Sequence, residues 1–336
     1  MLGTVLMLRR YPVKSMLGED VPASDVTGKG LAHDRALALG HRETGKVASA
    51  KNPRVWRGLL KLAVAVDPGS AVVGSAGPGP GPGPCPGVAG SGVWITLPDG
   101  KTLCSSDPGI DAVLSEVLGQ PVTLTGAPPP KAELDRAVPE EVLRDGVTAR
   151  VAVETGQLGG GSPAGTFFDF APIHLLTTST LDRIAELTPR GVAEVERYRP
   201  NIVIRTSAAA GFTENDWTGH DLRIGRELTL RVMARTPRCA IPTLEHGDLP
   251  RDTAALRVLA DHNRVTPVEP LAPQPCAGAY AQVLHPGRIR VGDVVRLADG
   301  EPALVAHRQP ASPGGALVRA RDPIAATAIP LSKRAD

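Results

Sequence analysis

The sequence is short of aromatic residues, of net charge and of long apolar runs. Its 336 residues include only three Trp, three Tyr and four Phe, so a core must be built mostly from aliphatic side chains. Lys and Arg number 37 and Asp and Glu 35, a net charge of +2 that gives no basic field for steering nucleic acid. No run approaches 18 apolar residues, and the N-terminus MLGTVLMLRRYPVK lacks the regions of a signal peptide, so no membrane association is predicted.

Cysteine is scarce as well, and the four cysteines stand far apart, at Cys85, Cys104, Cys239 and Cys276. No C-x-x-C pair occurs, which leaves structural zinc and thioredoxin-type redox chemistry unsupported. A chain of this length buries enough surface to fold without disulfides, and four cysteines do not make a disulfide framework. We therefore predict a cytoplasmic protein with reduced thiols, in which Cys85 has no special role.

The signatures of several common enzyme classes are missing too. The glycine-rich run at residues 156–161 does not have the G-x-x-x-x-G-K-[ST] form, and no G-x-G-x-x-G stands between a strand and a helix. Neither H-E-x-x-H nor G-x-S-x-G occurs. These absences argue against nucleotide-binding enzymes of the usual types, zinc proteases and α/β-hydrolases.

What the chain does have is a series of short apolar segments rich in β-branched residues and bounded by Gly, Pro and Asp, which predict strands. The clearest are residues 4–9, 37–40, 59–66, 93–97, 101–104, 173–177, 201–206, 222–234, and a closing pair at 278–284 and 289–297. Helices are predicted after Asp107-Pro108, after Ser179 and from Pro250. Many short strands with few helices favour a mainly β fold of barrel type with appended helices, in the α+β class.

The length predicts about two domains, and composition shows where they divide. Residues 74–92 contain GPGPGPGP, which forms neither helix nor ladder and is typical of an exposed loop. Three consecutive prolines at 128–130 mark a linker. We predict a β domain over residues 1–126, a second domain over 127–298 and a loosely ordered tail over 299–336.

Two polar segments stand beside predicted strands. Lys14 and Ser15 follow the first strand, and an ammonium beside a hydroxyl can bind an anion. Arg199 and Asn201 flank Pro200, which predicts an extended backbone before it, and they suit a phosphate or a heterocycle edge. Taken alone, each segment is more often an ordinary polar turn or a surface charge cluster. His33, His174 and His246 lie near these segments and are expected to be satisfied polar residues.

A third segment carries a thiol. Cys239 is flanked by Arg235 and Arg238, whose positive potential favours the thiolate. A thiolate can act as a nucleophile or as a soft metal ligand. The alternative is a buried structural cysteine, which is the commoner role for a lone cysteine.

Together these segments are more specific than any one of them. YPVKS (11–15) and GLAHDR (30–35) are followed in order by FFDFAPIHLLTTSTL (167–181), RYRPNIVI (197–204), FTENDWTGHDLRIG (212–225), PRC (237–239), GAY (278–280) and GRIRVGDVV (287–295). This ordered set resembles the MOSC family, the molybdenum cofactor sulfurase C-terminal family, in its amidoxime-reducing-component-like branch. The resemblance implies an N-terminal MOSC β domain over 1–126 and a MOSC β-barrel domain over 127–298.

The resemblance also implies a function. It points to an oxidoreductase that binds molybdenum–molybdopterin (Moco) and reduces N-hydroxylated or similar N–O substrates, with electrons from an external ferredoxin- or flavin-type donor. Cys239 would be the catalytic residue and the molybdenum ligand, which fits a soft, sulfur-rich centre. The cofactor-binding residues implied are Lys14, Ser15, Arg35, Thr178, Ser179, Arg199, Asn201, Arg238 and Tyr280. Backbone amides around residues 177–180, at a helix N-terminus, could add to anion binding.

Some features differ from the family pattern and leave alternatives open. Ala277 stands where an aromatic residue is expected before the GAY glycine, which affects the pocket wall. The chain has no C-x₄-C-x₂-C run of a fused ferredoxin module. The family is also associated with pyridoxal phosphate enzymes, but no aminotransferase-like domain with a Schiff-base lysine is found. A sulfur carrier with a Cys239 persulfide and a non-catalytic cofactor-binding module remain the rival interpretations.

Overall fold

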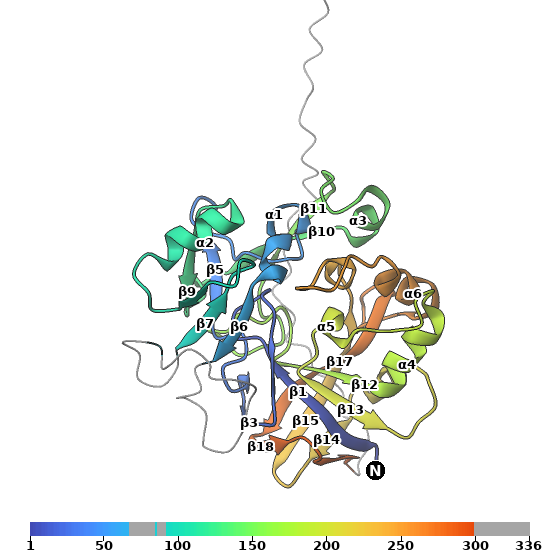
Figure 1. Cartoon of the computed structure of the whole chain (residues 1–336). Helices are drawn as coiled ribbons and strands as arrows, with labels where there is room; N and C mark the ends of the chain where they lie inside the picture. Colours follow the sequence, from blue (N-terminus) through green and yellow to red (C-terminus); the bar gives the residue numbers. More distant parts are fainter. Residues whose placement is uncertain (67–84, 86–91, 299–336) are drawn as a thin grey trace, which may run out of the picture. The chain divides into compact units, whose positions relative to one another are not determined.

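Seven strands close into a barrel (Figure 1). Their order is β12-β13-β1-β19-β14-β15-β17, and β17 pairs back with β12 to complete the ring. Their bounds are Gly3–Arg10 (β1), Ile173–Thr177 (β12), Ile202–Thr206 (β13), Asp221–Ile224 (β14), Leu228–Pro237 (β15), Gln274–His285 (β17) and Val294–Leu297 (β19). Only the β12–β13 pair is parallel within this ring. The computed structural model describes residues 1–66, 85 and 92–298, so most of the predicted loop at 74–92 and the whole predicted tail lie outside the described residues.

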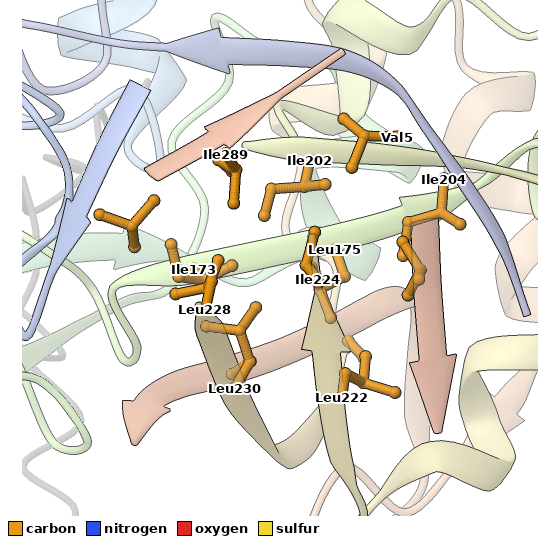
Figure 2. Close-up of a cluster of buried hydrophobic side chains, with 14 of the residues drawn as sticks. Val5, Ile173, Leu175, Ile202, Ile204, Leu222, Ile224, Leu228, Leu230 and Ile289 are labelled. Atoms are coloured by element: carbon orange, nitrogen blue, oxygen red, sulfur yellow. The ribbon is translucent and has the colours of Figure 1, made fainter. Parts of the chain in front are cut away.

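Aliphatic side chains fill the barrel and explain why these segments form strands. Ile173 and Leu175 on β12 are fully buried, as are Ile202 and Ile204 on β13, and Figure 2 shows them converging with side chains of other strands. The spacing of two places them on one face, because successive strand residues point to opposite sides. Each such side chain contributes about 1.5–3 kcal/mol when fully buried. The predicted mainly β fold with appended helices is confirmed.

The first strand joins the N-terminal and C-terminal parts of the chain. β1 lies between β13 and β19 and pairs with both. A register shift between Val5 and Met7 marks a bulge against β13. Strand β3 (Ala23–Thr27) likewise pairs with β18 (Gly287–Arg290). Backbone pairing therefore crosses the domain boundary predicted after residue 126, and that boundary stays a prediction.

A second hydrophobic core lies under small sheets of the first 126 residues. It includes Val13, Leu39, Ile95 and Leu114, all buried. The elements around it are β5 (Ala38–His41), α1 (Pro53–Trp56), the 3₁₀ helix η1 (Arg57–Lys61), β6 (Ala63–Val66), β7 (Val93–Thr96), β8 (Thr102–Cys104), α2 (Ile110–Leu118) and β9 (Val122–Thr125). The other small strands of this half are β2 (Glu19–Val21) and β4 (Gly30–Leu31).

Two predictions in this half were partly wrong. The strand expected over 59–66 begins only at Ala63, because residues 57–61 form a 3₁₀ helix. Within that helix Leu59 and Leu60 are both fully buried, each in a different hydrophobic cluster. The helix expected to begin at Asp107-Pro108 begins at Ile110, because Gly109 takes a left-handed φ of 85°.

The remaining elements cover the barrel or connect its strands. They are β10 (Glu133–Ala137), α3 (Pro139–Asp145), β11 (Val153–Gln157), α4 (Thr178–Leu187), α5 (Val195–Tyr198), η3 (Thr213–Trp217), η4 (Ile241–Thr243), α6 (Ala254–His262) and β16 (Arg264–Val265). No element was predicted over 131–165, because every residue of β11 is exposed and shows no apolar alternation. The expected closing strand 289–297 divides into β18 and β19, which pair with β3, β1 and β14 rather than with β17.

Two helix starts also differ from prediction. Thr177, not Ser179, caps α4, and its hydroxyl accepts a hydrogen bond from the Thr180 backbone N–H at 3.1 Å. Helix α6 begins at Ala254, four residues after Pro250.

The cysteines correct one further prediction. Cys85 and Cys104 form a disulfide, with their Cα atoms 5.7 Å apart, so reduced thiols are wrong for this pair. Cys239 and Cys276 are free. In the part of the chain that the structure describes, no helix is long and apolar enough to cross a membrane.

Candidate cofactor site

A cavity of about 250 Å³ gathers residues from distant parts of the sequence. Eight of the ten predicted site residues line it: Lys14, Ser15, Arg35, Arg199, Asn201, Arg238, Cys239 and Tyr280. They come from the segment after β1, the segment between β4 and β5, the residues after α5, the segment that follows β15 and the middle of β17. The fold therefore brings together the three polar segments that the sequence presented separately.

The backbone at the cavity is strained. In the part of the chain that the structure describes, four non-glycine residues have a positive φ, and three of them, Ser15, Arg35 and Arg199, line the cavity. Left-handed backbone costs about 1–2 kcal/mol for a residue with a Cβ, and such strain concentrates at functional sites. For Arg199 this corrects a prediction, because its φ of 54° and ψ of 49° are not the extended conformation expected before Pro200.

Two arginines share the ring of Tyr11 but differ in their partners. The Arg199 and Arg35 guanidinium carbons lie 4.2 Å and 4.5 Å from the ring centroid. Arg35 pairs with the buried carboxylate of Asp34 and donates to Asn201 Oδ1 at 3.1 Å. Among the described residues, no hydrogen bond or ion pair engages the Arg199 guanidinium, although the residue is buried. Burial lowers the pKa of Arg199 to about 10, so it keeps its charge at neutral pH.

A carboxylate between two lysines forms another part of the lining. The carboxylate oxygens of Asp169 lie 2.6 Å from Lys14 Nζ and 2.9 Å from Lys51 Nζ. Lys14 Nζ also donates to the Phe167 carbonyl at 2.8 Å. Burial lowers the pKa of Lys14 to about 8, although Asp169 opposes that shift. Burial alone would raise the pKa of Asp169, but the two ammonium groups hold it well below its usual range.

The thiol of Cys239 is half-buried at the end of β15 and packs against a cluster that contains Leu60 and Ile241. Arg238 is fixed by two hydrogen bonds, from its backbone N–H to the Pro275 carbonyl at 2.8 Å and from Nη2 to the Tyr198 carbonyl at 2.8 Å. Its Nε is buried and has no hydrogen-bond partner among the described residues, and the same holds for Nε of Arg235. Unpartnered buried N–H groups are destabilising, so these two donors fit a site built for an acceptor.

Thr178 and Ser179 are the two predicted residues that do not line the cavity. The Thr178 hydroxyl accepts from the Thr206 N–H at 3.1 Å, and the Ser179 hydroxyl donates to the Gly211 carbonyl at 3.0 Å. The start of α4 is also occupied by a buried carboxylate, because Glu214 Oε1 accepts from the Thr177 N–H at 2.6 Å. Burial raises the pKa of the Glu214 carboxyl group, and the cofactor-binding role implied for Thr178 and Ser179 stays a prediction.

Four residues that line the cavity were not predicted from the sequence as site residues. They are Lys51, Arg136, Asp169 and Phe170. Asp169 lies inside the FFDFAPIH run, so a signal existed. Lys51 and Arg136 stand in segments without such a signal. The fold brings these segments together, since the Ala137 N–H donates to the Lys51 carbonyl at 2.9 Å. His174 also lines the cavity, and burial together with Arg238 lowers its pKa to about 3, so the ring is neutral.

These residues fit an anionic cofactor that brings its own metal ligands. Arg199 offers an unengaged cation, and Arg238 and Arg235 offer unpartnered donors. Cys239 offers one soft thiol ligand. Within residues 1–66, 85 and 92–298, no group of three His, Cys, Asp or Glu side chains could hold a metal ion. A metal at Cys239 would therefore take its other ligands from a cofactor.

Similar proteins were found by sequence and by structure. The MOSC N-terminal beta barrel domain matches residues 2–66 and the MOSC domain matches residues 162–296, together more than half of the chain. Mitochondrial amidoxime-reducing component 1 of Mus musculus is 26% identical over 306 residues, 88% of this chain and 82% of the relative.

Two solved structures are more distant. YiiM from Geobacillus stearothermophilus is 15% identical, with a TM-score of 0.28 over 41% of this chain and 60% of the other. A hypothetical protein is 14% identical, with a TM-score of 0.29 over 45% and 67%. These two likenesses are too weak to support any inference about fold or function. The two domain matches, in the order that the motifs run, show that the chain belongs to the MOSC family, which is associated with molybdenum cofactor binding, in its amidoxime-reducing-component-like branch.

Proposed function

We propose that this protein is a molybdenum-cofactor-dependent oxidoreductase that reduces N-hydroxylated or similar N–O compounds. The observation that carries the proposal is a half-buried thiol, Cys239, in a cavity with a buried cation, Arg199. The Arg199 guanidinium stacks on the Tyr11 ring and has no hydrogen bond or ion pair among the described residues. The relative named mitochondrial amidoxime-reducing component 1 supports the substrate class. Reduction of a hydroxylamine-type group to an amine and water consumes two electrons and two protons.

In this proposal the chain's own residues bind and orient the cofactor. Cys239 would coordinate molybdenum, and the cofactor would supply two-electron redox chemistry. Lys14, Ser15 and Arg199 would bind its phosphate through charge-assisted hydrogen bonds. Arg35 and Asn201 are already bonded to each other and to Asp34, so they would present a fixed polar edge to the pterin. Arg238 and Tyr280 would complete the wall around the metal.

The electrons would come from a separate ferredoxin- or flavin-type protein. Seven cationic residues line the cavity, against one carboxylate, Asp169. The seven are Lys14, Arg35, Lys51, Arg136, Arg199, Arg235 and Arg238. Such a field attracts an acidic donor at a rate that falls with salt. Turnover driven by an acidic ferredoxin should therefore fall more steeply with ionic strength than turnover driven by a small uncharged reductant. If both rates fall with ionic strength equally, the hypothesis of electrostatic docking is wrong.

The decisive experiment is analysis of protein purified from a host that makes the cofactor. We expect near-stoichiometric molybdenum and pterin, and reduction of an amidoxime when an artificial electron donor is added. A metal-free protein with a persulfide on Cys239 would support the sulfur carrier instead. Bound cofactor without reduction of any N–O compound would support a non-catalytic module.

A further inference from the structure

One side of the cavity is an apolar wall, which includes one of the proposed cofactor-binding residues, Tyr280. Phe170, Val268 and Tyr280 pack on a small buried cluster of Ala171, Met233 and Ala234. The rings of Phe170 and Tyr280 lie 5.4 Å apart with a tilt of 44°. Each of these three side chains lines the cavity and is only partly buried, so it presents apolar surface to whatever enters.

The loop between β16 and β17 extends this wall. Leu271 lines the cavity, and 48% of the residue is exposed. The loop is fixed at its start, because the Thr266 carbonyl accepts from Arg235 Nη1 at 3.0 Å and the Pro267 carbonyl accepts from the Arg235 N–H at 3.1 Å. The Leu271 N–H closes a turn onto the Val268 carbonyl at 2.9 Å. Leu271 therefore stands on an anchored loop, and its exposed surface is part of the site.

The wall differs in chemistry from the rest of the lining. Among the described residues, the lining carries seven cationic side chains and one carboxylate, and that carboxylate is already paired with two lysines. The proposed anionic cofactor would offset much of this charge. The wall offers apolar surface instead, so a molecule with an apolar body gains by covering Leu271 and the two rings.

We propose that Phe170, Leu271 and Tyr280 form the substrate-binding wall, and that the substrate is an N–O compound with an apolar body. This inference rests on the proposed function and adds the class of substrate within it. Leu271 is then a specificity-determining residue, because it contacts the substrate body and not the N–O group that reacts.

Two neutral amidoximes that differ only in their bodies test this. Benzamidoxime carries a phenyl ring and acetamidoxime a methyl group, beside the same N–O group. With the holoenzyme and an artificial electron donor, Leu271→Ala should raise KM for benzamidoxime roughly tenfold and leave acetamidoxime nearly unchanged, since lost apolar contacts in a pocket discriminate by about 10–200-fold. Leu271→Met, which keeps the apolar volume, should restore most of the preference.

Leu297→Ala is the matched control, because Leu297 is exposed to 40% on β19 and does not line the cavity. The same ratio of KM values in wild type and Leu271→Ala would overturn the inference. Calorimetric binding of both amidoximes without a reductant gives a second readout. If the holoenzyme reduces neither compound, the proposed function fails. The calorimetric binding data then still test the wall. A loss of affinity for benzamidoxime but not for acetamidoxime in Leu271→Ala supports it, and unchanged affinities for both compounds in that variant overturn it.

Discussion

The barrel interior and the cavity are built by opposite means. The barrel core holds aliphatic side chains such as Ile204 and Leu222, placed by regular alternation along strands. The cavity holds buried cations such as Lys14 and Arg199, and three of its residues have left-handed backbone. The barrel therefore stabilises the fold, whereas the cavity contains features that destabilise the protein unless an anion is bound.

The largest effect on stability is expected in the barrel. Ile204→Ala removes a fully buried side chain and should lower the free energy of unfolding by about 2–5 kcal/mol. Urea unfolding of the cofactor-free protein measures this. Cofactor content per folded molecule should stay the same. The neighbouring exposed residue provides the control, since Arg205→Ala should change stability by less than about 0.5 kcal/mol. Equal losses in both variants would refute the account of the core.

A smaller effect with a defined pH dependence is expected at Lys14. Its pKa is lowered to about 8 in the folded protein, chiefly by burial, whereas a lysine in an unfolded chain titrates near 10.4. Between these values the unfolded chain binds the extra proton, so stability should rise with pH from about 8 to about 10.4. Lys14→Met should remove on the order of 1–3 kcal/mol of this rise.

The measurement is urea unfolding of cofactor-free protein at pH 7.5, 9 and 10. Lys29 is exposed, so Lys29→Met should keep the wild-type slope. A slope that survives in Lys14→Met would show that burial of this ammonium does not shape the stability of the site.

The smallest effect on stability is expected at Arg199, together with a large effect on binding. Arg199→Gly relieves the left-handed backbone, worth about 1 kcal/mol, and gives up the contact with the Tyr11 ring, worth a similar amount. Unfolding should therefore change by no more than about 1 kcal/mol, while cofactor occupancy falls. Exposed Arg223 serves as the control through Arg223→Ala. Unchanged occupancy in Arg199→Gly would break the contrast between the two regions.

The same contrast explains what could be predicted from sequence. Strands such as β12 and β13 follow from local alternation, and the order of the motifs identified the family. The pairing of Lys14 with Asp169 joins residues 155 positions apart, and no local pattern reports it. That Thr178 and Ser179 do not line the cavity was equally invisible, because only the fold shows that Glu214 accepts from the Thr177 N–H at the start of α4. The apolar wall was also invisible, since Leu271 lies in a loop without periodicity.

The central claim is that Cys239 holds a molybdenum cofactor in this cavity. Molybdenum content and amidoxime reduction should be measured together in wild type, Cys239→Ala and Cys276→Ala, each purified from a cofactor-competent host. Cys276 is a free, buried cysteine that does not line the cavity, and it controls for loss of a thiol. The account predicts near-stoichiometric molybdenum with turnover in wild type and Cys276→Ala, and loss of turnover with weakened molybdenum retention in Cys239→Ala. Full molybdenum content and full turnover in Cys239→Ala would contradict it.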